Sequence, residues 1–300
     1  MRALLAVLAL AALTAGCSSS STSERSAPKA GSLEALWKET KHSVALIPGT
    51  NDYSPGALRI SFLVVDDRAR LIAPPTARFW ISRSLESRPF QETVARLEPV
   101  GVPGVSTGAD VPSIYVAHVR VQTPGRYVVL ARPVGKVSIG GIRDVIVNSR
   151  SATPAVGARA YRSATPTLAS TGGDLRRLTT ADPPDRALLR YSIAGSLAAH
   201  APFVVTFATP RYCTSRTCGP VVDVVERARR RFERDGIRFI HVEIYKNNDP
   251  RQGRNTWVKQ WHLPSEPWTF LVGRDGLIKA KFSGSVSTRE LESTIRRVLE

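Results

Sequence analysis

The arrangement of apolar residues changes once along this chain, near residue 148, and this change limits the folds that it can adopt. Before that point, apolar and polar residues alternate in short runs separated by turns, as in 58–62, 77–81 and 115–121. After it, apolar residues at helical spacing are interrupted by short, continuous apolar runs. Alternation is typical of strands with one buried face, whereas the mixed pattern is typical of helices packed on a sheet. We therefore expect an all-β unit followed by an α/β unit.

Residues 41–148 are predicted to form the all-β unit. Thr-Pro-Gly at 123–125 marks a turn between the strands expected at 115–121 and 126–130. Because no amphipathic helix separates these short strands, the expected architecture is a β-sandwich. The final hairpin resembles those of immunoglobulin-like and fibronectin-like modules of bacterial surface proteins. This resemblance implies a unit that binds a partner or acts as a spacer.

The segment 149–184 is predicted to be a linker. It is rich in Ser, Thr, Pro, Gly and Ala, and it contains Ser-Ala-Thr-Pro twice, starting at Ser151 and Ser163. Two tetrapeptides in a segment of biased composition are too short to indicate a structural repeat. The segment is therefore interpreted as a linker from its composition.

Residues 185–300 are predicted to form the α/β unit, with helices packed on a mixed sheet. Helices are expected at 185–199 and 220–235, and strands at 203–207 and 237–245. A hairpin is expected where 268–272 and 277–282 flank Gly-Arg-Asp-Gly, and a last helix where Ser287 and Glu290 form a capping box.

The N-terminus is predicted to direct export and lipid attachment. Residues 1–16 hold one Arg and an apolar run too short to cross a bilayer permanently, which is typical of a signal peptide. The segment 13–17, Leu-Thr-Ala-Gly-Cys, resembles the bacterial lipobox. That resemblance implies lipidation of Cys17 and a location at the extracytoplasmic face of the cell membrane. Residues 17–40 begin with a run poor in apolar side chains and are expected to be a flexible tether.

The chain is strongly basic, with a formal charge of +17. An exported protein of this charge favours anionic lipid headgroups or anionic cell-envelope polymers as partners, and its compartment argues against nucleic acid. The basic residues are scattered, so solvated basic faces are an alternative interpretation.

The two remaining cysteines, Cys213 and Cys218, follow the apolar run at 203–207. This arrangement, with Gly219 and Pro220 opening the next helix, resembles the cysteine segment of thioredoxin-like proteins, and Glu266-Pro267 resembles the stretch that holds their cis-proline. The likeness covers about residues 156–300. It implies thiol-disulfide exchange with exported proteins, with Cys213 and Cys218 as catalytic residues and Glu266 and Pro267 as substrate-binding residues.

The spacing of the pair departs from that family. Four residues, rather than two, separate Cys213 from Cys218. Two helical residues five positions apart point to different faces, whereas a disulfide requires Cα atoms within about 7 Å. One cysteine must therefore precede the helix. Because Pro220 suits a first helical position, we expect Cys218 or Gly219 at the cap and Cys213 in the loop.

Two questions about the pair stay open at this point. By its order in the family Cys213 would attack, but the positive end of the helix dipole could make Cys218 the more acidic thiol. The pair could also be a structural disulfide on a non-catalytic binding module, or it could handle copper together with His262. No motif implies a bound metal or any other cofactor.

Overall fold

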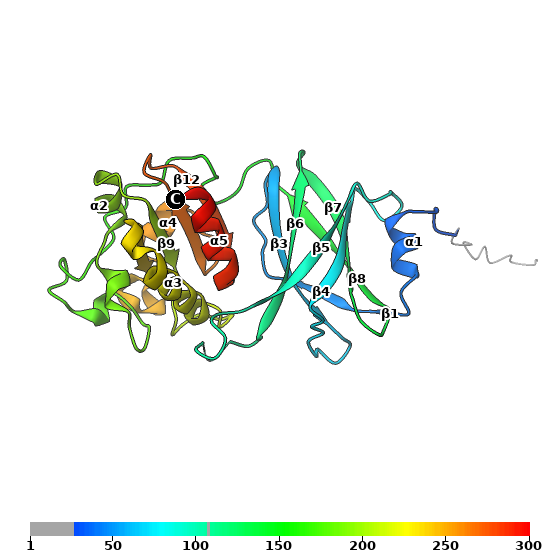
Figure 1. The fold of residues 1–300 in the computed structure, drawn as a ribbon, viewed down its shortest axis with the longest axis horizontal. Coiled ribbons are helices and arrows are strands. Elements are labelled where there is room, and N and C mark those ends of the chain that lie inside the picture. Colours follow the sequence, from blue (N-terminus) through cyan, green and yellow to red (C-terminus); the bar gives the residue numbers. More distant parts are fainter. Residues whose placement is uncertain (1–26, 107–108) are drawn as a thin grey trace, which may run out of the picture.

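The computed structural model describes residues 27–106 and 109–300 (Figure 1). The predicted signal peptide, residues 1–16, and the predicted lipidation site Cys17 lie outside the described residues. Two sheets stand side by side along the longest axis of the molecule, and the helix α1 (Leu33–Lys38) lies at the end farthest from the C-terminal part (Figure 1).

The first sheet has eight strands in the order β1-β8-β7-β4-β5-β6-β3-β2. All pairs are antiparallel except β1 with β8. The strands are β1 (His42–Ser43), β2 (Ala45–Pro48), β3 (Gly56–Val65), β4 (Thr76–Ser82), β5 (Gln91–Pro99), β6 (Ser113–Val121), β7 (Gly125–Pro133) and β8 (Ile139–Val147).

This sheet is nearly closed because its two edge strands, β1 and β2, are consecutive in the chain. The amide of Val44, between them, donates to the carbonyl of Gly140 at 3.2 Å. A Cβ on Gly141 would lie 2.7 Å from the carbonyl oxygen of Val44 and 2.8 Å from the Leu46 side chain. Glycine therefore permits the close backbone approach by which the two edges meet.

Aromatic side chains fill the interior of the eight-stranded sheet. The ring of Phe62 stacks on Phe79 and on Tyr115, with centroids 5.5 Å away in each case. On the outside, Leu33 of α1 packs against Trp80 and Leu130 in a separate cluster. Alternate strand residues thus face the interior and the helix, which is the alternation that the sequence displays.

The second sheet has four strands in the order β10-β9-β11-β12, with β9 parallel to β10 and β11 antiparallel to both neighbours. Its strands are β9 (Phe203–Phe207), β10 (Arg238–Val242), β11 (Trp268–Val272) and β12 (Ile278–Ser283). The helices around it are α2 (Ile193–Ala198), α3 (Cys218–Phe232), α4 (Thr256–Gln260) and α5 (Thr288–Val298). Single turns of 3₁₀ helix are η1 (Leu175–Arg177), η2 (Arg186–Leu189), η3 (Glu233–Asp235), η4 (Lys246–Asn248) and η5 (Pro250–Gln252).

The two faces of the second sheet bury separate clusters. Val204 packs with α3 and α5, whereas Phe203, Val205 and Phe207 pack with Trp261. Successive strand residues point to opposite faces, so the continuous apolar run of β9 is explained by burial on both sides.

Residues 149–184 lie against the second sheet. The amides of Gly157 and Ala160 donate to carbonyls at Ile278 and Gly276, so this stretch follows the β12 hairpin. Farther on, Ser163 accepts a hydrogen bond from the Trp261 ring at 3.0 Å, and Leu178 is buried. A composition typical of linkers thus occurs here in an ordered, packed segment.

The predicted fold class, an immunoglobulin-like sandwich plus a thioredoxin-like α/β unit, is wrong. The described residues contain twelve strands, and only α3 and α5 are longer than six residues, so the protein is mostly β. Alternation shows which residues face inward, but it does not show whether strands form two facing sheets or one nearly closed sheet. The helix expected at 185–199 is interrupted, because Ser192 caps the short α2 after η2 has ended.

Candidate functional site

Cys213 and Cys218 lie close enough for their side chains to interact where α3 begins. Thr217 is the N-cap of α3, Cys218 its first residue, and Cys213 lies in the β9–α3 connection. The amide of Arg216 donates to the carbonyl of Cys213 at 3.2 Å, and Arg216 has a positive φ of 51°, so the intervening residues form a turn. Both thiols are free and buried, Cys218 completely and Cys213 with 8% of its surface exposed.

The helix begins two residues before Pro220, earlier than expected from its preference for the first position. Proline fits at the third helical position as well, because the first four amides of a helix have no partner within it. This shift places Cys218 inside the first turn.

Cys213 is surrounded by hydrogen-bond donors. The thiol of Cys218 donates to its sulfur, the Ser215 hydroxyl lies 3.4 Å away, and the amides of Cys218 and Thr217 also point to it. The Cys218 hydrogen bond is the largest cause that lowers the pKa of Cys213 to about 5, although burial acts in the opposite direction. Cys213 is therefore a thiolate at neutral pH, the form that acts as a nucleophile.

Cys218 has the opposite character. Burial raises the pKa of its thiol, and the neighbouring Cys213 raises it further, whereas the Thr209 amide lowers it. Its proton is thus retained and shared with the Cys213 sulfur. One thiolate and one protonated thiol side by side form an asymmetric pair.

Glu266 and Pro267 lie next to this pair at the start of β11. The peptide bond between them is cis, and the carbonyl of Pro267 accepts from the Gly284 amide at 2.9 Å. Burial raises the pKa of the Glu266 carboxyl, and the charge of Cys213 raises it further, so the two groups are close enough to interact. Arg254 lies 3.8 Å from this carboxylate. The structure therefore brings all four predicted site residues of the C-terminal part together.

Tyr245 and Arg254 belong to the same neighbourhood, and sequence reasoning missed both. The Tyr245 ring contacts Tyr212, with centroids 6.3 Å apart, and its pKa is raised by burial first and then by Glu266. Arg254 donates to the carbonyls of Leu263 and Pro264, at 2.6 and 3.1 Å, and thereby holds the loop before Pro267. Neither residue belongs to a recognisable sequence motif. In particular, a single Arg does not stand out in so basic a chain.

The eight-stranded sheet also reaches this site, through the connection between β5 and β6. Val102 belongs to the hydrophobic cluster that contains both cysteines, and Asp110 lies 3.4 Å from Arg216 in an ion pair. A Cβ on Gly101 would lie 2.8 Å from Pro220. Residues far from the cysteines in sequence therefore cover the start of α3.

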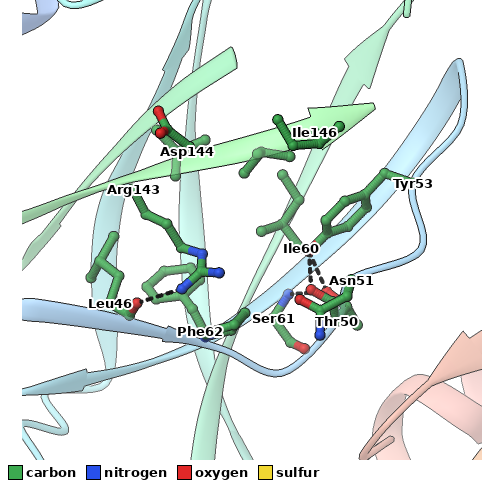
Figure 2. Close-up of a pocket in the computed structure, with 13 residues that line it drawn as sticks. Leu46, Thr50, Asn51, Tyr53, Ile60, Ser61, Phe62, Arg143, Asp144 and Ile146 are labelled. Carbon is green, nitrogen blue, oxygen red and sulfur yellow. Dashed lines mark hydrogen bonds between the residues drawn. The ribbon is translucent and has the colours of Figure 1, made fainter. Parts of the chain in front are cut away.

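A cavity of about 130 Å³ opens where β2, β3 and β8 meet (Figure 2). Figure 2 shows Arg143 reaching the Leu46 carbonyl, to which it donates at 3.2 Å, and Tyr53 bonded to Thr50. Arg143 and Tyr53 thus bond to neighbouring groups, whereas the buried hydroxyl of Ser61 has no hydrogen-bond partner among the described residues. No cysteine or histidine lines the cavity. The cysteine pair is the stronger candidate for chemistry.

Within residues 27–106 and 109–300, no three His, Cys, Asp or Glu side chains are grouped so that they could hold a metal ion. His262, the third ligand in the copper alternative, packs on the ring of Tyr161 instead, with centroids 6.2 Å apart. In the same described ranges, no helix combines the length and apolar character needed to cross a membrane.

Comparison with known proteins found no family model that matches this chain and no curated protein with a significantly similar sequence. The function is therefore inferred from the geometry of the site.

Proposed function

We propose that this protein carries out thiol-disulfide exchange with exported proteins. The observation that carries the proposal is the contact between Cys213 and Cys218 at the start of α3, where one sulfur receives hydrogen bonds and the other is buried and donates one. A nucleophilic thiolate beside a protonated, shielded thiol is the arrangement that two-step exchange requires. Cys213 is the attacking residue and Cys218 the resolving one.

The reaction proceeds through a mixed disulfide. The Cys213 thiolate attacks one sulfur of a partner disulfide, the partner S–S bond breaks, and the leaving sulfur departs as a thiolate that takes up a proton. Cys218 then loses its proton to water and attacks the Cys213 sulfur, which releases the second partner thiol and leaves a Cys213–Cys218 disulfide. The partner gains two electrons and the protein loses two. The reverse sequence oxidises a partner dithiol.

The change of charge in the first step assists the second. Negative charge on Cys213 is one cause of the raised pKa of Cys218. Forming the mixed disulfide removes this charge, and the pKa of Cys218 then falls because the repulsion is lost. The resolving thiol is thus activated only after a partner has bound.

Glu266 and Pro267 are proposed to contact the partner protein, since they adjoin Cys213 at the start of β11. The Glu266 carboxylate would favour a basic or hydrogen-bond-donating residue beside the partner's cysteine. Lipid on Cys17 would keep this exchange at the extracytoplasmic face of the membrane, and the net charge of +17 would favour contact with anionic envelope polymers there.

The test is to trap the intermediate. In Cys218→Ser the mixed disulfide on Cys213 cannot be resolved, so adducts with exported proteins should accumulate and disappear on reduction with dithiothreitol. Cys213→Ser is the matched control and should form few adducts, as should the double variant. Adducts are detected on non-reducing gels of the membrane fraction.

Two outcomes would contradict the proposal. Adducts confined to Cys213→Ser would transfer the attacking role to Cys218. Absence of adducts from both variants, with both less stable than the oxidised parent protein by similar amounts, would indicate a structural disulfide on a binding module.

A further inference from the structure

The main chain that follows β9 contacts the sulfur of Cys218. The amide of Thr209, two residues after the end of the strand, donates a hydrogen bond to this sulfur. Both residues are completely buried. A hydrogen bond to a sulfur stabilises its thiolate form, so this amide lies where the resolving thiol has to lose its proton.

The peptide group that supplies this amide is held on its other side by His241 of β10. Its carbonyl, that of Ala208, lies 3.0 Å from Nε2 of His241. The amide of Ala208 also donates to the carbonyl of Val242 at 3.0 Å. Ala208 is thus bonded to two consecutive residues of β10, to the main chain of one and to the side chain of the other.

The ring of His241 is itself fixed by a second contact. Its Nδ1 lies 3.3 Å from the hydroxyl of Thr179, which accepts from the amide of Ala181 at 3.0 Å. A carbonyl oxygen only accepts hydrogen bonds, so Nε2 carries the proton that is donated to Ala208. In the neutral ring Nδ1 is then an acceptor, and the Thr179 hydroxyl is its donor. Both ring nitrogens are therefore engaged, and neither is free to take the proton of Cys218.

The register of the sheet places His241 on the face that α3 covers. Its partner in β9 is Thr206, and the preceding pair on that face is Val204 with Phe239. Val204 and Phe239 belong to the hydrophobic cluster that contains α3 and both cysteines. Alternate residues of a strand share a face, so His241 points to the same side of the sheet as the cysteine pair.

The hydrogen bond from His241 can act on the sulfur through the peptide group. Hydrogen bonds in a chain polarise one another, so a donor on the Ala208 carbonyl strengthens the Thr209 amide as a donor. The same bond fixes the plane of the peptide group and keeps this amide directed at Cys218.

We infer that His241 is a positioning residue for the resolving cysteine, because it orients the peptide group whose amide stabilises the Cys218 thiolate. The inference rests on the proposed thiol-disulfide exchange. In the resolving step Cys218 gives its proton to water and attacks the sulfur of Cys213. The bond from Cys213 to the partner sulfur breaks, and the partner leaves as a thiolate. His241 transfers no proton in this step.

The experiment separates the two steps with the aromatic disulfide 5,5′-dithiobis(2-nitrobenzoate), added in an equimolar amount to the reduced full chain. Attack by Cys213 should release a first coloured thionitrobenzoate and leave a mixed disulfide. Cys218 should then release the second in an intramolecular reaction. Cys218→Ser should lose the second release, and the double variant Cys213→Ser/Cys218→Ser measures any reaction of Cys17, which is subtracted.

His241→Leu should slow the second release by about threefold to fivefold and leave the first unchanged. A weaker hydrogen bond leaves less Cys218 as thiolate, although the remaining thiolate is more nucleophilic and offsets part of the loss. His241→Gln keeps an N–H donor and should restore most of the second rate. Thr206→Val is the matched control, because it removes a buried hydroxyl, bonded to Thr269 at 3.0 Å, from the neighbouring strand. It should leave both releases unchanged.

If His241→Leu does not fold, Thr179→Val takes its place, because it removes the hydroxyl from Nδ1 and keeps the shape of the side chain. It should slow the second release selectively as well. Equal slowing of both releases, or an unchanged second release, in the variant that folds would overturn the inference and leave the exchange reaction intact. A parent protein that releases a single thionitrobenzoate would overturn both this inference and the proposed exchange.

Discussion

At the scale of single residues, two chemically identical thiols differ because their surroundings differ. Cys213 receives hydrogen bonds from a thiol, a hydroxyl and two amides, whereas Cys218 is enclosed by apolar side chains and faces a negative sulfur. Hydrogen bonds to the charged form stabilise a thiolate, and loss of water destabilises it. The proposed division between an attacking and a resolving cysteine thus rests on a few contacts at the start of α3.

Alkylation of the reduced protein should report the lowered pKa of Cys213. With iodoacetamide, the rate should rise through about pH 5 and then level off, whereas an ordinary thiol gains reactivity up to about pH 8.5. Ser215→Ala removes one donor and should slow alkylation at pH 6 by about threefold to tenfold, while the neighbouring exposed Thr214→Ala should not. A rate that still increases between pH 7 and 9 in the parent protein would contradict the assignment.

At the scale of elements, the eight-stranded sheet depends on the meeting of its two edges. The strands β1 and β2 are short, and they join through Val44, which lies against Gly140 and Gly141 of β8. Unpaired strand edges promote association with other chains, and near closure removes most of that exposed edge. Small side chains on β8 are thus a requirement of the architecture.

Gly141→Ala should destabilise the protein by about 2–3 kcal/mol, since the new Cβ overlaps backbone that cannot move without opening the sheet. Gly135→Ala is the matched control, because its Cβ would make only an ordinary contact, 3.7 Å from Pro74, and should change stability by less than about 0.5 kcal/mol. Urea unfolding gives both values. Equal effects of the two changes would show that the edges do not need this close approach.

At the scale of the whole molecule, charged side chains join the two sheets across their interface. Arg59 of β3 donates to both carboxylate oxygens of Glu290 on α5, at 2.8 and 2.9 Å, and both side chains are almost completely buried. Glu98 at the end of β5 accepts from Ser287, the N-cap of α5, and pairs with Arg289. The start of α5 is therefore anchored on the eight-stranded sheet.

Arg59→Leu should cost about 3–5 kcal/mol of unfolding free energy, because it leaves the Glu290 carboxylate buried without its partner. Arg78→Leu is the control: the Arg78–Glu92 pair is half exposed and should contribute about 1 kcal/mol or less. Burial alone would raise the pKa of Glu290, but the charge and hydrogen bonds of Arg59 bring it below the ordinary value.

The pH dependence of that effect has a defined sign. A carboxyl with a lowered pKa in the folded state contributes stability that is present above its unfolded pKa, about 4.3, and lost as the pH falls through the folded value. The difference between Arg59→Leu and the parent protein in urea unfolding should therefore shrink as the pH falls. In the variant burial raises the pKa of Glu290, so its carboxyl is protonated first, and the parent then loses its own contribution below about pH 4. A difference that stays constant down to pH 3 would show that Arg59 acts through packing alone.

The sequence by itself determined the local features. The alternation of 58–62 and 115–121, the buried run of β9, the helix expected at 220–235 and the cap at Ser287 all depend on neighbouring residues, and each has a counterpart in the structure. The placement of Cys213 before the helix also followed from local geometry, because a five-residue separation within one helix keeps two thiols apart.

Only the tertiary structure decided how these elements combine. Whether the N-terminal strands form two sheets or one nearly closed sheet depends on contacts such as that of Val44 with Gly140, which alternation does not encode. The pKa values of the cysteines, the place of Arg254 beside Glu266 and the packing of residues 149–184 likewise arise from groups distant in sequence. Local preferences act between neighbours, whereas burial and electrostatics act through space, so the chemistry of the site appears only when the chain has folded.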